Sequence, residues 1–336
     1  MSPVETPLVS VVTPVYNGAE FLADCVESVL HQTYANWEHI VVNNCSKDGT
    51  LEIAQRYAQR DSRIRVHDNE TFLGVIDNHN LAFSLTSPAA KYCKVVSADD
   101  LMFPECLTRM VELAEANPSV GMVGAYMLAG KQVVNVGLGY GQNVVNGHDI
   151  CRTTLLGGPY VFGSPTSLLY RSDLIRATPA FYPTSNPHAD TTAIYQALEH
   201  SDFGFVHQVL SYARIHSDSQ TSKSIKYGRI NRAMMADLIR FGPAYLSQDE
   251  RQERLAVLLE WYYDVLVRAV VENRRNKEFW ALQKSEMHDM GLEFSWARLL
   301  KATVLKGVRS ALNPGSAWGK LSAVTKRGDA VEAKYY

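Results

Sequence analysis

Short apolar runs alternate with polar turns along the first part of the chain. Runs rich in β-branched residues predict strands at 8–12, 37–42, 64–67, 92–96 and 120–124. Between them, apolar residues recur every three or four positions, which predicts helices at 19–30, 51–60 and 104–116, and a loop with a helix at 71–84. This alternation indicates an α/β fold, with a mainly parallel central sheet and helices on both faces.

Polar loops follow three of these strands, at 13–18, 43–50 and 97–100. Right-handed crossovers place the carboxyl ends of parallel strands at one edge of the sheet, so the loops are expected to converge there. That layout is typical of a nucleotide site. The first loop has one glycine instead of Gly-x-Gly-x-x-Gly, which argues against a dinucleotide site.

The third loop ends in two adjacent carboxylates, Asp99 and Asp100. Adjacent carboxylates repel each other unless a positive charge lies beside them, and Mg²⁺ or Mn²⁺ suits such hard oxygen ligands. The alternative is that the pair caps the helix that Pro104 begins, because Asp is a good N-cap and Pro is tolerated in a first turn. The pair alone leaves both interpretations open.

Composition narrows the class of protein. The hydrophobic content is 46% and the formal net charge is -2, which gives no general case for nucleic-acid binding. The five cysteines include no Cys-x-x-Cys pair, which argues against a zinc site or a disulfide framework and fits a reducing compartment. Residues 1–7 lack the pattern of a secretory signal, and no apolar run could cross a bilayer. We therefore expect a cytoplasmic protein.

Several motifs together resemble the opening of family 2 glycosyltransferases. They are Val-Ser-Val-Val-Thr-Pro-Val-Tyr-Asn-Gly at 9–18, the helix end at 28–34, the segment 37–50, Asn80 and the Ser-Ala-Asp-Asp segment at 97–100. The resemblance covers about residues 8 to 222. It implies the glycosyltransferase-A fold of nucleotide-diphospho-sugar transferases, a nucleotide-sugar donor, a divalent metal and inversion at the anomeric carbon.

The resemblance also implies roles for individual residues. Asp100 would bind the metal directly, and Asp99 would face the ribose or the metal. The expected nucleotide site comprises Thr13, Pro14, Tyr16, Asn43, Asp48, Asn80 and Asp99, with the first three beside the base. The sequence departs from the family pattern where Asn43 replaces an Asp that reads the base, and where Ser97 replaces a further Asp.

The second half of the resemblance carries the expected acceptor side. The Gly/Pro-rich loop at 157–171, with Gly158 and Tyr160, borders the sugar and acceptor in the family, although such loops also occur without a function. Asp190 opens a predicted helix through about residue 199 and is either its N-cap or, as the resemblance implies, the catalytic base. The family often has Glu-Asp at this point, whereas this chain has Ala189 before Asp190.

A polar segment at 211–222 follows a predicted strand at 206–210 and resembles a Tyr-Arg-x-His-x-x-Ser motif, slightly shifted. Arg214 could neutralise phosphate, and His216 could complete the metal site or touch the diphosphate. For His216 the alternative is a polar surface residue.

Beyond residue 222 the pattern is helical. An apolar stripe predicts a helix over 251–287, and 296–312 reads as a basic amphipathic helix. That helix either lies on an anionic membrane surface, at the inner face of the membrane, or presents a solvated face while it packs on the protein. The tail at 313–336 is expected to be flexible.

The sequence thus predicts a catalytic domain at 1–222, a helical extension at 223–312 and a tail at 313–336. The expected function is inverting transfer of a sugar from a nucleotide-diphosphate donor, a UDP-sugar by family habit, to a glycan or lipid-linked acceptor in polysaccharide or glycolipid assembly. A nucleotidyltransferase and a catalytically inactive binding module are the alternatives. The first usually has a basic, Gly-rich loop, and 13–18 contains no Lys or Arg.

Overall fold

A computed structural model gives the fold, and it describes residues 6–184, 188–215 and 229–312. The chain divides into two compact units. The first, called the sheet unit, comprises Met1–Thr154 and Gly158–Ile215. The second, called the helical unit, comprises Leu155–Gly157 and His216–Tyr336. The domain boundary predicted at residue 222 and the tail predicted at 313–336 lie outside the described residues.

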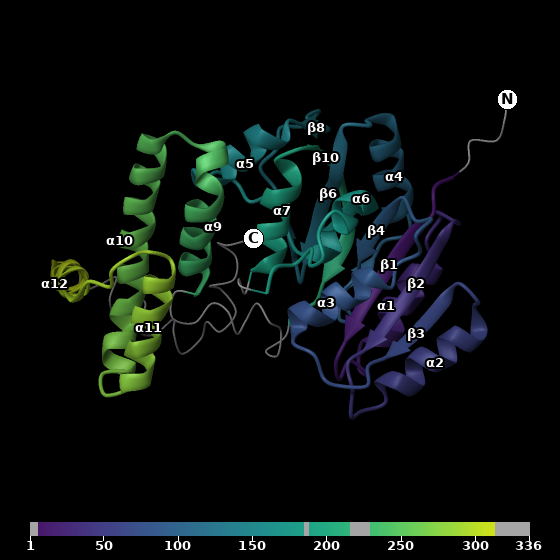
Figure 1. Ribbon diagram of the computed structural model, residues 1–336, viewed down its shortest axis with the longest axis horizontal. Coiled ribbons are helices and arrows are strands. Elements are labelled where there is room, and N and C mark those ends of the chain that lie inside the picture. The colour runs from purple at the N-terminus through teal and green to yellow at the C-terminus, as the bar shows by residue number, and fades with distance from the viewer. Residues whose placement is uncertain (1–5, 185–187, 216–228, 313–336) are drawn as a thin grey trace. The chain divides into compact units, whose positions relative to one another are not determined.

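One sheet forms the centre of the sheet unit, with the strand order β3-β2-β1-β4-β9-β6-β10-β5 (Figure 1). Two further strands extend it, because β7 pairs with β6 and β8 pairs with β10. The strands are β1 (Val9–Val15), β2 (Trp37–Asn43), β3 (Ile64–Asp68), β4 (Tyr92–Val95), β5 (Leu101–Met102), β6 (Val120–Ala129), β7 (Gln132–Val134), β8 (Val144–Val145), β9 (Leu168–Arg171) and β10 (Asp202–Ala213).

The pairing is parallel through β3, β2, β1 and β4, and again between β6 and β10. Strand β9 lies between these two parallel groups and runs antiparallel to both neighbours, β4 and β6. The predicted α/β class with a mainly parallel sheet is confirmed, and β9 is the joint within it. The parallel register carries the ends of β1 and β4 to the same edge, as the loop argument requires.

Helices cover both faces of this sheet (Figure 1). Alternate residues of β1, Val9, Val11 and Val15, share one apolar core with α1, α2 and α4, as the two-residue period of a strand dictates. Phe83 of α3 packs edge-to-face on Phe181. The helices are α1 (Leu22–Leu30), α2 (Thr50–Arg60), α3 (Val75–Ser84), α4 (Cys106–Ala116), α5 (Gly147–Leu155), α6 (Ser172–Arg176) and α7 (Ala189–Leu198), with a 3-10 turn, η1, at Pro165–Ser167.

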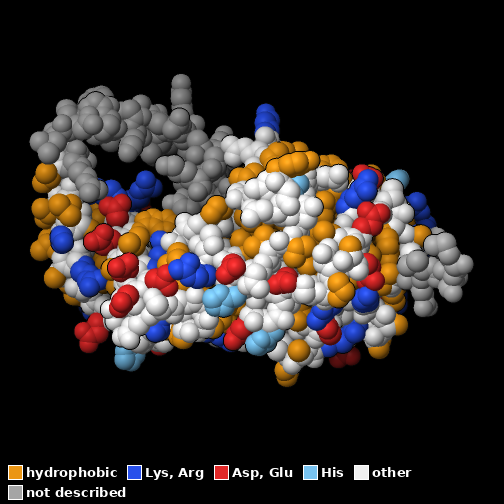
Figure 2. All heavy atoms as spheres, turned by 90° about the horizontal axis from the view of Figure 1, so that it is seen from above, with side chains coloured by type: hydrophobic (Ala, Val, Ile, Leu, Met, Phe, Trp, Pro, Cys, Tyr) orange, Lys and Arg blue, Asp and Glu red, His pale blue; other side chains and the backbone are white. Residues whose placement is uncertain are grey.

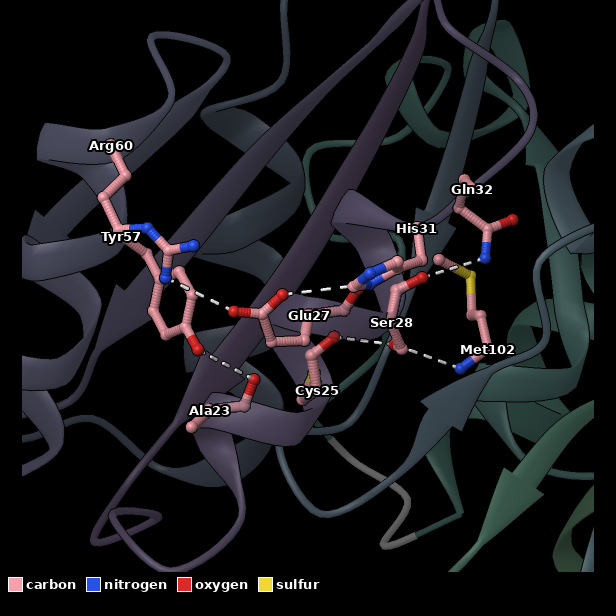
Figure 3. Close-up of polar contacts among 9 residues, drawn as sticks. All are labelled: Ala23, Cys25, Glu27, Ser28, His31, Gln32, Tyr57, Arg60 and Met102. Carbon is pink, nitrogen blue, oxygen red and sulfur yellow. Dashed lines mark hydrogen bonds and ion pairs between the residues drawn. The ribbon is translucent and has the colours of Figure 1, made fainter.

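Polar contacts fix α1 on both sides (Figure 3). Glu27 pairs with Arg60 of α2 at 3.3 Å, on the outer side. On the inner side, the Ser28 hydroxyl donates to the Cys25 carbonyl at 2.7 Å and accepts the backbone N–H of Met102 at 3.2 Å. Met102 belongs to β5, directly after the acidic pair, so α1 fixes one end of the turn that carries it.

The helical unit contains α9 (Arg229–Tyr245), α10 (Gln248–Glu272), α11 (Lys277–Asp289) and α12 (Trp296–Leu312). The predicted helical character of 251–287 is confirmed, but the stretch forms two helices, because the chain breaks between α10 and α11. Asn276 causes the second start, since its side chain accepts the N–H of Phe279 at 3.0 Å as an N-cap. Helix α9 was not predicted. Within the described part of the chain, no helix has both the length and the apolar character needed to cross a membrane.

Candidate functional site

The acidic pair lies in a turn at the end of β4, in the middle of the sheet. The Asp100 N–H donates to the Ser97 carbonyl at 2.9 Å, which closes the turn. The hydroxyl of Thr166 donates to Asp100 Oδ2 at 2.7 Å and accepts the Ser97 N–H at 3.1 Å. Asp100 is 6% exposed and Thr166 is fully buried. The hydrogen bond from Thr166 therefore fixes the orientation of the Asp100 carboxylate.

A buried lysine supports Thr166. The ammonium of Lys94, on β4, donates to the carbonyls of Thr166 at 2.5 Å and Leu168 at 3.1 Å, and its side chain is fully buried. Burial lowers the pKa of Lys94, while the nearby Asp100 is among the groups that oppose the shift. Lys94 thus joins β4 to the segment that carries Thr166. The sequence analysis identified neither residue, because a Thr and a Lys in apolar runs carry no local signal of this contact.

The loops after β1 and β2 are fastened to each other. Asp48 accepts backbone N–H groups from Ala19 and Thr50, each at 3.1 Å. Burial alone would raise the pKa of Asp48, but these hydrogen bonds and the Thr50 hydroxyl lower it below its ordinary value. Asn17, at a φ of 50°, accepts the Lys47 N–H at 2.8 Å. Asp48, predicted in the nucleotide site, therefore shapes the loops on which a nucleotide would rest.

Asn43 ends β2 and is 1% exposed. Its amide nitrogen donates to Asp68 Oδ1 at 2.7 Å, and among the described residues its Oδ1 has no hydrogen-bond partner. The extra donor that distinguishes Asn43 from the family's Asp is thus used within the protein. The oxygen, which both residue types share as an acceptor, is buried.

Two exposed aromatic rings lie beside these loops. Tyr16 and Phe72 are 47% and 60% exposed, and their ring centroids are 4.9 Å apart in an edge-on arrangement. Phe72 was missed, although an aromatic residue in a polar loop after the third strand is a signal that could have been used. Thr13, in contrast, is fully buried, and its hydroxyl lies 2.9 Å from His39 Nε2. Pro14, between them, is partly buried.

Asn80 of α3 forms two hydrogen bonds with the backbone of Tyr182. Its amide donates to the Tyr182 carbonyl at 2.7 Å, and its Oδ1 accepts the Tyr182 N–H at 2.9 Å. This pair of bonds fastens the segment before α7 to α3. In the structure, Asn80 therefore holds the backbone of Tyr182. The nucleotide role that the resemblance implied for Asn80 stays a prediction.

Asp190 lies in the first turn of α7 and is partly buried. It is close enough to His79 to oppose the lowering of the His79 pKa that burial causes. Its neighbour Thr191 is 2.9 Å from the hydroxyl of Tyr160. The preceding Gly158 turns closely, with its N–H 2.9 Å from the Thr153 carbonyl.

The segment 158–167 thus contacts both the helix that carries Asp190 and the acidic turn that carries Asp100. Its Tyr160 contacts the helix of Asp190, and its Thr166 contacts Asp100. Two carboxylate sites that are distant in sequence are therefore positioned by one loop. The Gly/Pro-rich composition that marked this loop in the sequence is what allows its close turns.

The positive group predicted for phosphate is engaged elsewhere in this structure. Arg214 donates to Asp24 of α1 at 2.6 Å, and its guanidinium lies 5.0 Å from the ring centroid of Phe21. Burial raises the pKa of the Cys25 thiol. The charges of Asp99 and Asp100 raise it further, and the nearby charge of Arg214 opposes this rise. Arg214 is therefore paired with an acidic side chain of α1, and its predicted phosphate role stays a prediction. His216 lies outside the described residues.

The donor set fits a hard cation that is shared with a substrate. Mg²⁺ and Mn²⁺ bind through one or two carboxylates together with substrate phosphates. Asp99 and Asp100 provide such carboxylates in the turn after the carboxyl end of β4. In the described ranges, no group of three or more His, Cys, Asp or Glu residues could hold a metal without such help.

Comparison with known proteins places the chain. The sequence model described as glycosyl transferase family 2 matches residues 10–176. An uncharacterized glycosyltransferase of Haemophilus influenzae is 28% identical over 191 residues, 55% of this chain and 58% of its own. TuaG of Bacillus subtilis, named as a candidate teichuronic acid biosynthesis glycosyltransferase, is 36% identical over 124 residues, 37% of this chain and 48% of its own. The chain spans about half the length of these curated relatives.

Solved structures agree on the fold. TarS 1-349 of S. aureus in complex with UDP-GlcNAc has a TM-score of 0.62 at 18% identity, over 84% of this chain and 80% of TarS. The mannosyltransferase PcManGT of Pyrobaculum calidifontis, in complex with GDP-Man and Mn²⁺, has a TM-score of 0.56 at 16% identity, over 96% and 85%. The solved structures show the glycosyltransferase-A fold, and the family match shows that the chain belongs to glycosyl transferase family 2.

Proposed function

We propose that this chain is an inverting glycosyltransferase that moves a sugar from a nucleotide-diphosphate donor to an acceptor hydroxyl. The observation that supports the proposal is that the loop 158–167 contacts both the acidic turn and the helix of Asp190. An inverting displacement at an anomeric carbon needs a group that stabilises the charge on the leaving diphosphate. It also needs a base on the opposite side of the sugar, beside the acceptor hydroxyl.

The residues divide the work as follows. Asp190 takes the proton of the acceptor hydroxyl while that oxygen forms its bond to the anomeric carbon. The bond from this carbon to the donor phosphate breaks, and the nucleoside diphosphate leaves with the electron pair. Asp100 and Asp99 would hold Mg²⁺ or Mn²⁺, which supplies charge stabilisation for the leaving diphosphate. Thr166 keeps the Asp100 carboxylate in place.

The donor is proposed to be a UDP-sugar, bound with its base beside Tyr16 and Phe72 and within reach of the Asn43 amide. A hydrogen-bond acceptor at Asn43 suits the N–H that a uracil ring presents. The UDP-GlcNAc complex of TarS, which shares the fold, supports this choice. The acceptor is proposed to be a glycan or lipid-linked glycan in polysaccharide assembly, and the name of TuaG supports that class.

A thermal-shift screen of UDP, GDP, CDP and dTDP, each with and without Mn²⁺, tests the donor site. A ligand that binds only the folded protein raises the melting temperature by mass action. UDP with Mn²⁺ is expected to give the largest shift, and Asp100→Ala is expected to abolish the part that depends on Mn²⁺. Asp149→Ala, an exposed carboxylate on α5, is the matched control. If no nucleotide shifts the wild type, or Asp100→Ala behaves like the control, the proposed site is wrong. Binding without any release of nucleoside diphosphate would indicate the inactive module instead.

A further inference from the structure

Helix α12 of the helical unit has one face fixed on α10. Leu299 is 3% exposed on this face. Lys306 reaches Asp264 of α10 and donates to its carbonyl oxygen at 3.1 Å. The ring of Trp296, at the start of α12, lies 5.1 Å from the rings of both Trp280 and Phe294. The orientation of the helix in its own unit is therefore set by packing.

A second side of α12, which meets the packed side at Trp296, exposes an apolar stripe. Trp296, Leu300, Val304 and Val308 recur at every fourth residue, so they lie along one side of the helix. Each is about half exposed or more, up to 65% for Leu300. Figure 2 shows hydrophobic side chains gathered at the left edge of the molecule, where α12 lies in Figure 1. Single exposed apolar residues are ordinary, but a stripe of four on one helix marks an interaction surface.

The charged residues of α12 itself are all basic. The helix contains four basic residues and no acidic residue. The whole chain, in contrast, has 33 basic and 35 acidic residues. Arg298 and Lys301 are exposed, whereas Lys306 is paired with Asp264 of α10. The basic residues are Arg298, Lys301, Lys306 and Arg309.

We propose that the exposed face of α12 docks on a membrane surface that contains anionic phospholipid. The apolar stripe would enter the boundary between headgroups and acyl chains, with Trp296 at the level of the headgroups, and the basic side chains would contact lipid phosphates. The helix would lie in the plane of the surface without crossing it.

A second copy of the chain fits this surface less well. Two-fold pairing of α12 with itself would bring together two helices that each carry four basic residues and no carboxylate to offset the repulsion. An anionic lipid surface matches both the apolar stripe and the charge. The inference does not depend on the proposed activity, because it rests on the helical unit alone.

Co-sedimentation of the full chain with vesicles tests the proposal. We expect binding to vesicles of phosphatidylcholine mixed with phosphatidylglycerol, little binding to phosphatidylcholine alone, and loss of binding as NaCl rises. The double variant Leu300→Ser/Val304→Ser is expected to bind at least about tenfold more weakly, because both side chains are apolar contacts with the bilayer. Arg298→Gln/Lys301→Gln should weaken binding and flatten its dependence on salt.

The matched control is Val257→Ser/Leu282→Ser. These two residues are each 53% exposed on α10 and α11, outside the stripe, and their loss should leave vesicle binding unchanged. The proposal is overturned if wild type does not bind anionic vesicles, or if the control weakens binding as much as the stripe variant. It is also overturned if ultracentrifugation shows a wild-type dimer that Leu300→Ser/Val304→Ser dissociates, since the stripe would then face a second copy. Unchanged melting temperatures confirm that the variants are folded.

Discussion

At the scale of single residues, the acidic turn is held by buried hydrogen bonds of residues that are not carboxylates. The Thr166 hydroxyl donates a hydrogen bond to Asp100 and accepts one from the Ser97 N–H, and Lys94 donates to the carbonyl of Thr166. A hydroxyl that donates to a carboxylate fixes the direction in which the remaining lone pairs point. The affinity of the proposed metal site should therefore depend on a residue that does not touch the metal.

Thr166→Val tests this dependence, because it keeps the shape and removes the hydroxyl. We expect the concentration of Mn²⁺ needed for half-maximal donor binding to rise by about 10- to 100-fold. Thr166→Ser, which keeps the hydroxyl, should restore it to near the wild-type value. Isothermal titration with Mn²⁺ at saturating UDP measures both. Equal Mn²⁺ dependence for wild type and Thr166→Val would show that the hydrogen bond to Asp100 has no part in metal binding.

Asp190→Asn separates the base from the donor site. Loss of a positioned general base costs about 10²- to 10⁴-fold in rate, while donor binding should persist because Asp190 is assigned to the acceptor side. Release of nucleoside diphosphate gives the rate, and the thermal shift with UDP and Mn²⁺ gives the binding. Asp149→Asn, in the first turn of α5, is the control for a carboxylate at a helix start. An equal loss of donor binding in Asp190→Asn would count against the base role.

At the scale of elements, a strong local signal at a helix start was present in the sequence. Ser247 and Glu250 form a capping box at the start of α10, in which the Ser247 hydroxyl accepts the Glu250 N–H and the Glu250 carboxylate accepts the Ser247 N–H. We expect Ser247→Ala to lower the free energy of unfolding by about 1 kcal/mol. Ser285→Ala, exposed within α11, should have little effect or slightly stabilise the protein. Urea unfolding measures both, and equal stability of the two variants would refute the cap.

Patterns that act over a few residues predicted β1 to β4, β6, β10 and most helices of the sheet unit, whereas the short strands β5, β7 and β8 were not predicted. The apolar runs that became β1, β2 and β4 have a period that their own residues determine. The antiparallel direction of β9 was not predictable in this way, because it follows from pairing with β4 and β6, which precede it by dozens of residues. The contact of Thr166 with Asp100 was hidden for the same reason. The break between α10 and α11 was missed, although Asn276 is a residue type that favours a helix N-cap.

At the scale of the whole molecule, stability should depend on pH through His39. Burial lowers the pKa of His39 to about 3, and its Nδ1 has no hydrogen-bond partner among the described residues. An unfolded His titrates near 6.5, so between these values the unfolded chain binds more protons and the stability falls as the pH falls. From pH 7 to pH 5 this group alone should cost about 2 kcal/mol of unfolding free energy.

His39→Gln removes this titration. Urea unfolding at pH 7 and at pH 5 should show that wild type loses about 2 kcal/mol more than the variant over this range. Carboxylates with lowered pKa values, such as Asp48 and Glu38, are common to both proteins, so their contribution cancels in the comparison. Parallel losses in the two proteins would mean that His39 can be protonated within the fold.

The position of β9 also determines the order in which the sheet can be completed during synthesis. Strand β4 ends at Val95 and its neighbour β9 begins at Leu168, which is 73 residues later. At about 5–20 residues per second, the ribosome needs roughly 4–15 s to supply that neighbour. Until then, β4 presents an unpaired apolar edge, which is a template for pairing with other chains. A nascent or truncated polypeptide that stops before residue 168 therefore keeps this edge open to pairing with other chains.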